Sequence, residues 1–348
     1  MKIFFYDGDS KIMEPNYHLK MSSFGTVAYN MNRTLKKMGH FSDFNSAEWY
    51  GKCGSLDPQF RVPGRKSFYI NVWETNNTLP YYLLQAAQGR NIFGLCNNTT
   101  NLWRKYGYNA FTIYGGCDTE FWNQTQPKDP NVFTFCHVAH GSVRSGLEVT
   151  LKAFAQAFRN NSSVKLIIKD AVSFTDTLLN FIKTLDCNNI EIVNEFWTVD
   201  KVRDLYSKSH ATINLLRSAG FGLPLLECCA CNNLCITGDV TPTNELVDSS
   251  FAKMIAPKGE INMFPFVTEL EKQYGLKNYY GTFQYPEIPV FWDFDIDTVS
   301  NALLDVYQNW TTYQKINTRQ PIINRWKWEY TVENLVKHLQ ILDENSIP

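Results

Sequence analysis

Residues 217–230, which read RSAGFGLPLLECCA, are the part of the sequence best suited to chemistry. The apolar run before them predicts a β-strand and Leu225–Ala230 predicts a helix, so the glycines occupy a strand-to-helix turn. Glycines let the backbone approach a ligand closely, and the first amides of a helix are unpaired donors at a positive dipole end. The turn predicts a phosphate or diphosphate site, and the alternative is a plain turn that needs glycine for packing.

Glu227 lies about one to two turns into the same helix. A carboxylate in this place can accept hydrogen bonds from two vicinal hydroxyl groups, such as those of a ribose. The stretch therefore predicts a phosphate-binding turn beside a ribose-binding carboxylate.

The same stretch resembles the donor-site motif of retaining family-4 glycosyltransferases, which have the GT-B fold. The motif is matched at Gly220, Phe221, Gly222, Leu223, Pro224 and Glu227. Of these, the resemblance implies donor binding by all except Pro224. The sequence departs from the motif at Ala219, where the family has its first glutamate.

Residues 132–146 are similar to the strand-loop-helix of that family in which a pair of basic residues faces the diphosphate. Arg144 matches one basic position, His140 falls on another, and Ser145 replaces the usual lysine. The resemblance implies that all three bind the donor, with Arg144 catalytic, because a guanidinium stabilises the charge that develops on a departing diphosphate. The alternative for Arg144 is a solvated loop charge.

Two segments of the first half also resemble the family. Residues 72–75, which read VWET, are similar to its strand-end Trp-Glu element, so Glu74 is expected to face the cleft near the acceptor or the anomeric carbon, as a catalytic candidate. Residues 23–25 occupy the place of its first glycine loop, which puts Gly25 close to the donor phosphates.

Short apolar runs alternate with helical patterns along the chain, which is typical of a parallel α/β fold. Strands are expected at 2–6, 67–73, 109–114, 132–138, 164–168, 190–193, 211–215 and 234–237, and helices at 27–37, 79–87, 146–158, 176–185, 199–207, 225–230, 298–307 and 329–342. Residues 261–291 break this rhythm and are expected to be an insertion or an irregular segment.

A polar stretch at 124–131 predicts a linker, so two Rossmann-like doubly wound domains are expected to face each other across a cleft, which is the GT-B arrangement. Residues 1–127 would form the acceptor-side domain and residues 131–325 the nucleotide-sugar-binding domain. By resemblance, the helix at 326–345 would cross back onto the first domain.

Metal chemistry is not expected, although two patterns imitate it. Asp293, Asp295 and Asp297 resemble the metal-binding Asp-X-Asp of the other glycosyltransferase fold, but Asp297 precedes a predicted helix and is expected to be its N-cap. Cys228, Cys229, Cys231 and Cys235 lack paired CxxC spacing, which favours structural thiols over zinc. We therefore expect no obligatory metal or cofactor, only a UDP- or GDP-sugar as donor.

Composition limits the other classes of function. The 348 residues carry a net charge of −1, so no global field draws the chain to nucleic acid or to an anionic membrane. The start shows no signal peptide, no apolar run is long enough to span a membrane, and the nine scattered cysteines suit reduced thiols. A cytoplasmic location is expected, in the host cytoplasm if the protein is viral.

The resemblance implies a hexosyl- or pentosyltransferase that moves a sugar from a nucleotide-diphosphate donor to a hydroxyl group of a glycan or small molecule, whereas the residues alone predict a phosphate-binding cleft and a ribose-binding carboxylate. The resemblance implies retention of configuration. One alternative is a phage- or virus-type enzyme that glycosylates hydroxymethylated pyrimidines in DNA. Another is a catalytically weak nucleotide-sugar-binding scaffold, suggested by Ala219 and Ser145.

Overall fold

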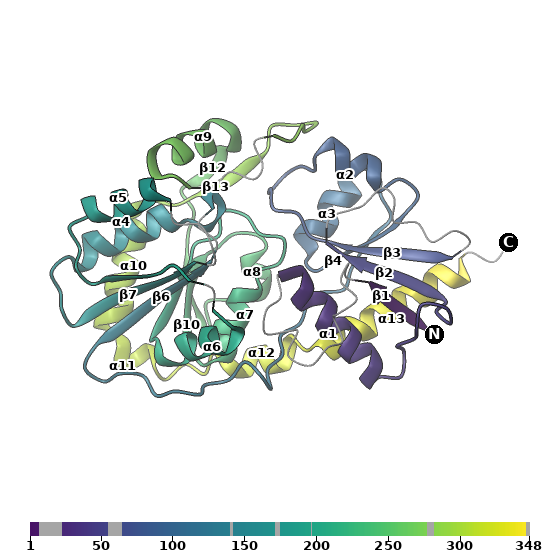
Figure 1. Ribbon diagram of the computed structural model, residues 1–348, viewed down its shortest axis with the longest axis horizontal. Coiled ribbons are helices and arrows are strands. Elements are labelled where there is room, and N and C mark those ends of the chain that lie inside the picture. The colour runs from purple at the N-terminus through teal and green to yellow at the C-terminus, as the bar shows by residue number, and fades with distance from the viewer. Residues whose placement is uncertain are drawn as a thin grey trace.

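The computed structural model of the protein describes residues 1–6, 23–54, 65–139, 142–170, 175–195, 197–276 and 282–345. They form two lobes that lie side by side, each with a parallel sheet and helices around it (Figure 1). The expected α/β fold with parallel sheets is confirmed.

The N-terminal lobe contains a parallel sheet whose described strands lie in the order β1-β2-β3-β4-β5. The strands are β1 (Ile3–Tyr6), β2 (Trp49–Cys53), β3 (Lys66–Asn71), β4 (Asn91–Gly94) and β5 (Ala110–Thr112). Helices α1 (Ser23–Lys37), α2 (Tyr81–Ala86) and α3 (Asn97–Lys105) belong to the same lobe. Apolar residues of β1 and β3 pack with α1, whereas Tyr69 of β3 shares a core with α2 and α3, so helices cover both faces.

This sheet differs in one respect from the expected doubly wound pattern, because its described strands follow chain order. The outer edge of β1 is occupied by the segment 40–42, where Ile3 and Phe41 form a parallel bridge. The strands that follow in the chain, from β2 to β5, therefore lie on the other side of β1.

The C-terminal lobe contains a six-stranded parallel sheet in the order β11-β10-β9-β6-β7-β8. The strands are β6 (Phe133–Ala139), β7 (Val164–Asp170), β8 (Ile190–Val193), β9 (Ala211–Asn214), β10 (Leu234–Gly238) and β11 (Ala252–Ile255). Helices α4 (Leu147–Phe158), α5 (Asp176–Thr184), α6 (Val199–Lys208), α7 (Leu223–Ala230), α8 (Thr243–Leu246) and α10 (Ile296–Gln308) accompany it. The strand order reverses between β6 and β9, and ligands of open α/β sheets bind at such a switch point.

The N-cap of α10 is Asp295, so the expectation for Asp297 was wrong. The Asp295 carboxylate accepts a hydrogen bond from the Thr298 amide at 2.9 Å. The helix begins two residues earlier than expected, at Ile296, and Asp297 lies in its first turn. There Asp297 accepts a hydrogen bond from Gln156 at 2.8 Å.

The expected irregular segment at 261–291 contains regular structure over much of its length. Strands β12 (Gly259–Asn262) and β13 (Val290–Asp293) pair antiparallel, and helix α9 (Met263–Tyr274) follows β12. Residues 282–289, which precede β13, leave this unit and reach the N-terminal lobe near α2 (Figure 1). We call residues 282–289 the strap.

The chain returns to the N-terminal lobe through α11 (Trp310–Tyr313), α12 (Arg319–Arg325) and α13 (Trp328–Glu344). Helix α13 packs along α1, and its Glu329 pairs with Lys37 at 2.6 Å (Figure 1). Trp328 is buried, and a Cβ at Gly116 would collide with it, so glycine permits this contact. Among the described helices, none combines the length and apolar character needed to span a membrane.

Candidate functional site

The glycine turn lies at the carboxyl end of β9, directly before α7. Gly222 is the N-cap of α7 with φ +109°, a backbone conformation that L side chains rarely adopt. Leu223 is the first residue of the helix and is half-buried, and Pro224 follows it. Glycine is therefore needed here for the backbone to turn from the strand into the helix.

Gly220 and Phe221 also bring the two lobes together. The Gly220 carbonyl accepts hydrogen bonds from Cys96 and Thr99, both at 3.2 Å, and a Cβ on Gly220 would lie 2.5 Å from the Cβ of Val72. Phe221 is buried and packs beside Gly115 and Trp326. The side chain of Phe221 and the carbonyl of Gly220 thus serve the interface between the lobes.

Glu227 is half-buried in α7, and its side chain makes no hydrogen bond or ion pair with the described residues. Burial, with a smaller contribution from nearby Cys228, raises the pKa of Glu227 to about 8. The pKa is raised because the charged form of a carboxyl group is costly without a cation or a hydrogen-bond donor beside it. Since its oxygens have no partner among the described residues, they can accept hydrogen bonds from a ligand.

Arg144 lies in a short 3-10 turn, Val143–Ser145, between β6 and α4. The turn ends at Gly146 with φ +65°, where a Cβ would collide with the Leu215 carbonyl oxygen. Close packing on the chain after β9 thus fixes the turn at the switch point of the sheet.

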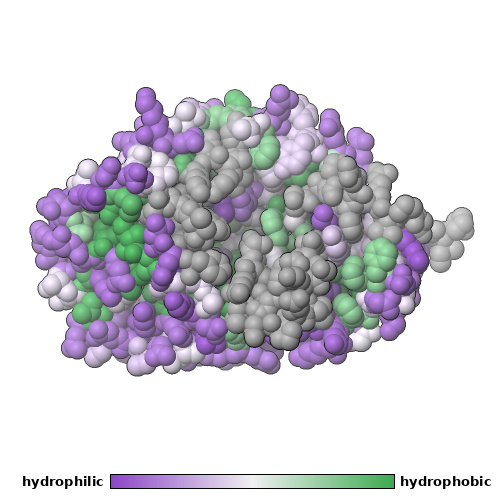
Figure 2. Space-filling model, viewed as in Figure 1, coloured by the Kyte–Doolittle hydropathy of each residue, from purple (hydrophilic) through white to green (hydrophobic). Residues whose placement is uncertain are grey.

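The two residues expected to be catalytic meet across the lobes. Arg144 Nη2 lies 3.1 Å from Glu74 Oε1, and the two side chains are 19% and 30% exposed. Glu74 follows β3, so the carboxyl ends of the two sheets face each other at this ion pair. The surface is hollowed between the two lobes on the face shown in Figure 2.

The other expected site residues lie in different environments. Ser145 is buried and its hydroxyl donates to the Ser142 carbonyl at 2.9 Å, so that donor is already used. Gly25 lies in the first turn of α1, because the helix begins at Ser23 rather than at the expected residue 27. His140 lies outside the described residues.

The residues expected to imitate metal sites have other neighbours. Asp293 lies 3.9 Å from Arg217 and 4.0 Å from Lys258. The sulfur atoms of Cys228, Cys229 and Cys235 lie within 4.8 Å of one another, all buried. Burial in the core around α7 favours structural thiols, and the absence of an obligatory metal stays a prediction.

A second group of residues, which the sequence did not single out, surrounds the ion pair. Buried Arg217 donates to the Val143 carbonyl at 2.9 Å and pairs with Glu148 of α4. Ser218 donates its hydroxyl hydrogen to the Glu74 carbonyl oxygen. The sequence signal for Arg217 was a charged residue inside an apolar run, directly after a strand.

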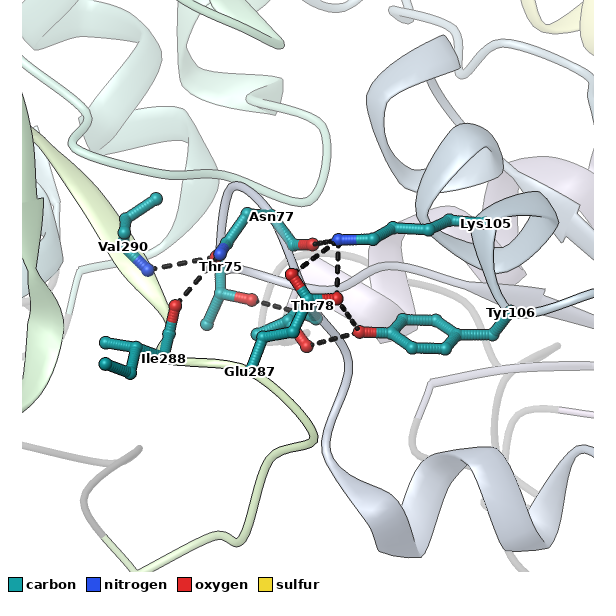
Figure 3. Close-up of polar contacts among 8 residues, drawn as sticks. All are labelled: Thr75, Asn77, Thr78, Lys105, Tyr106, Glu287, Ile288 and Val290. Carbon is teal, nitrogen blue, oxygen red and sulfur yellow. Dashed lines mark hydrogen bonds and ion pairs between the residues drawn. The ribbon is translucent and has the colours of Figure 1, made fainter.

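The strap connects the lobes at another edge of the cleft (Figure 3). Glu287 pairs with Lys105 at 2.6 Å and accepts a hydrogen bond from the Tyr106 hydroxyl at 2.9 Å. Asn77 donates to the Ile288 carbonyl at 2.9 Å and accepts from the Val290 amide at 3.0 Å. The loop that carries Glu74 is therefore held by hydrogen bonds from the C-terminal lobe.

Comparison with known proteins shows a similarity between the part of the chain that carries this site and one family. Residues 118–277 match the family model described as "Glycosyl transferases group 1", and this range includes Arg144, the glycine turn and Glu227. No curated protein sequence matches the chain.

Solved structures resemble nearly the whole chain. Sucrose-phosphate synthase from Thermosynechococcus elongatus is 12% identical with a TM-score of 0.63, over 93% of this chain and 79% of that one. A glycosyltransferase from Rickettsia africae is 12% identical with a TM-score of 0.61, over 96% and 85%. HepE from Anabaena, in complex with UDP and glucose, is 12% identical with a TM-score of 0.59, over 92% and 83%.

The fold is thus that of the GT-B glycosyltransferases. Within this fold, residues 118–277 are similar to the group 1 glycosyl transferases.

Proposed function

We propose that the protein transfers a sugar from a nucleotide-diphosphate sugar to a hydroxyl acceptor with retention of configuration. The observation that carries the proposal is the place of Arg144 at the switch point of the C-terminal sheet, 3.1 Å from Glu74 of the other lobe. A cation at this place faces the region where a diphosphate would rest on the turn before α7.

In the proposed mechanism, Arg144 stabilises the negative charge that grows on the diphosphate as the glycosidic bond breaks. The backbone amides of the glycine turn contribute further donors, and Glu227 accepts hydrogen bonds from the ribose hydroxyls. The acceptor attacks from the side of the leaving group, and its proton passes to the departing diphosphate. A separate general base is then not required.

Glu74 has a double role in this proposal. Before the donor binds, the Glu74 carboxylate holds Arg144 at the cleft. The guanidinium is then already oriented, so less side-chain entropy is lost when the donor binds. When Arg144 forms an ion pair with the diphosphate instead, its contact with Glu74 breaks. The Glu74 carboxylate can then turn toward the acceptor or the anomeric carbon.

The donor is proposed to be a UDP-sugar, with a GDP-sugar as the second choice. The Anabaena relative binds UDP and glucose, which supports a uridine nucleotide on this fold. The alternatives of a DNA glycosyltransferase and of an inactive scaffold gain no support from the family match, and we do not propose them. The cytoplasmic location stays a prediction.

The test is a transfer assay on the purified protein with a panel of UDP- and GDP-sugars and simple glycan acceptors. We expect one donor to be consumed with a turnover that Arg144→Ala lowers by roughly a hundredfold or more, and proton NMR to show the anomeric configuration of the donor in the product. A product with the inverted anomeric configuration would contradict retention. A protein that binds the donor but neither transfers nor hydrolyses it would be a nucleotide-sugar-binding scaffold and not an enzyme.

A further inference from the structure

Arg217 is a fully buried charged side chain at the start of the glycine turn. It lies outside the set of residues that the proposed mechanism brings to the donor. A buried guanidinium must be paired and hydrogen-bonded, because an isolated charge in the interior costs several kcal/mol. Its partners therefore indicate what it holds in place.

The side chain of Arg217 joins two neighbours of Arg144. It forms two hydrogen bonds with the Glu148 carboxylate, one of them at 3.2 Å from Nη1, and Nη1 also donates to the Val143 carbonyl at 2.9 Å. The guanidinium lies over the Phe266 ring, 4.8 Å from its centroid. The turn that carries Arg144 and the helix after it are thus held by one planar group.

The main chain of Arg217 completes the arrangement. Its amide donates to the Arg144 carbonyl at 2.9 Å. Its carbonyl accepts from the Asn76 side chain at 3.1 Å and from the Trp292 amide at 3.0 Å. Asn76 lies two residues after Glu74, so Arg217 contacts the backbone of Arg144 and the loop of its partner at the same time.

We propose that Arg217, paired with Glu148, is a positioning residue that sets Arg144 opposite Glu74. This inference rests on the proposed function, because it assigns Arg217 an effect on turnover that acts through Arg144. Buried ion pairs are frequently replaceable by apolar residues without loss of stability, so stability alone does not explain the pair. Fixing the direction of the Arg144 turn does explain it.

The test uses the double variant Arg217→Met/Glu148→Leu, which removes both charges and keeps most of the volume. Its melting temperature and its affinity for UDP establish that it is folded. The matched control is Arg90→Met, a buried arginine of the N-terminal lobe that lies over the Tyr69 ring at 4.7 Å.

We expect the double variant to lose about thirtyfold or more in turnover, because small misplacements of a reacting group are that costly, while the donor KM changes less than about threefold. Arg90→Met should keep wild-type turnover. In an Arg144→Ala background, the same double substitution should lower turnover by less than about threefold, because residues that act as one unit are not additive. Wild-type turnover in a folded double variant, or a full further loss in the Arg144→Ala background, would overturn the proposal.

A crystal structure of the double variant gives a readout that does not depend on the reaction. The proposal requires the Arg144–Glu74 separation of 3.1 Å to lengthen, and a change below about 0.5 Å would refute it. If the double variant does not fold, Arg217→Lys provides the same test, because it keeps a charge beside Glu148 but loses the planar fork. Wild-type protein that transfers no sugar would overturn the proposed function, and the crystallographic outcome would still decide the positioning role.

Discussion

Two arginine–glutamate pairs lie next to each other in this molecule and differ in almost every physical respect. Arg217–Glu148 is buried, with side chains 1% and 4% exposed, and it joins elements of one lobe. Arg144–Glu74 is 19% and 30% exposed and joins the two lobes, with a separation of 3.1 Å. A hydrogen bond from the Arg217 amide to the Arg144 carbonyl connects the two pairs.

From this difference we expect the buried pair to maintain the structure and the partly exposed pair to take part in the reaction. A buried pair with several hydrogen bonds cannot exchange partners without leaving a charge unpaired, so it holds a geometry. A partly exposed pair contributes less to stability, and its arginine can exchange the carboxylate for a phosphate.

The largest effect is expected for the buried pair. Arg217→Ala leaves the Glu148 carboxylate buried without its cation, so unfolding of the C-terminal lobe should become about 3–5 kcal/mol easier. Urea denaturation followed by intrinsic fluorescence measures this loss. The Arg217→Met/Glu148→Leu variant serves as its control and should recover most of the stability, and equal losses in both variants would contradict the argument.

Arg144→Ala should lower turnover by roughly a hundredfold or more, since one well-placed donor supplies about 3–4 kcal/mol in the transition state. Donor affinity should change less, because the turn amides and Glu227 remain. The melting temperature should stay near that of the wild type, unlike that of Arg217→Ala. Steady-state kinetics would contradict a transition-state role if only the KM rose, and Arg144→Lys should recover part of the rate.

Glu227 extends the comparison to a carboxylate that pairs with no cation in the described part of the chain. Glu227→Ala should weaken the binding of UDP by about 1–3 kcal/mol, because the hydrogen bonds to the ribose hydroxyls are lost. Calorimetry measures the affinity, with 2′-deoxy-UDP as the matched ligand. Unchanged affinity in a folded variant would remove Glu227 from the site.

The pKa of Glu227 predicts a pH dependence of stability. Its value of about 8 lies above the ordinary value of 4.5, so folding favours the protonated form. The contribution is complete below about pH 4.5 and is lost as the pH rises through about 8. Glu227→Gln should therefore melt with the wild type near pH 4.5 and above it at pH 8, and parallel melting curves across this range would show an unperturbed carboxyl group.

The smallest effect is expected at the strap. Lys105 and Glu287 are 43% and 42% exposed, so Glu287→Ala should change stability by less than about 1 kcal/mol. It should also leave turnover unchanged, because this ion pair joins the lobes without contacting Arg144 or Glu74. A large loss of turnover in Glu287→Ala would show that any contact between the lobes, rather than the Arg144–Glu74 pair in particular, controls the reaction.

Local signals were sufficient for the glycine turn and for many of the elements. The alternation of apolar runs predicted β6 and β7, and Gly222 has the left-handed backbone that a glycine before a helix suggests. The expectation failed for β2, β4 and α3, which went unpredicted. β2 contains a glycine and a lysine among its five residues, and α3 is rich in asparagine and threonine, which have low helix propensity.

The partners of charged residues could not be predicted, because pairing depends on segments far apart in the chain. Glu74 and Arg144 were each singled out, but their contact requires both sheets in place. The sequence does not indicate that Arg217 and Glu148 form a pair, because their contact depends on the packing of α4 beside the chain that follows β9. Asp295 and Asp297 each precede helical sequence, and only the actual start of α10 decides which of them caps it.

The return of α13 to the N-terminal lobe has a consequence for biosynthesis. Lys37 of α1 meets Glu329, 292 residues later, and the Trp49 indole meets Asp343, 294 residues later. The inner face of α13, with Val332, Leu335 and Leu339, fills part of the core next to β1 and α1. During translation, the N-terminal lobe therefore exposes apolar surface until α13 has been synthesised. We expect the C-terminal lobe to complete its folding before the N-terminal lobe does.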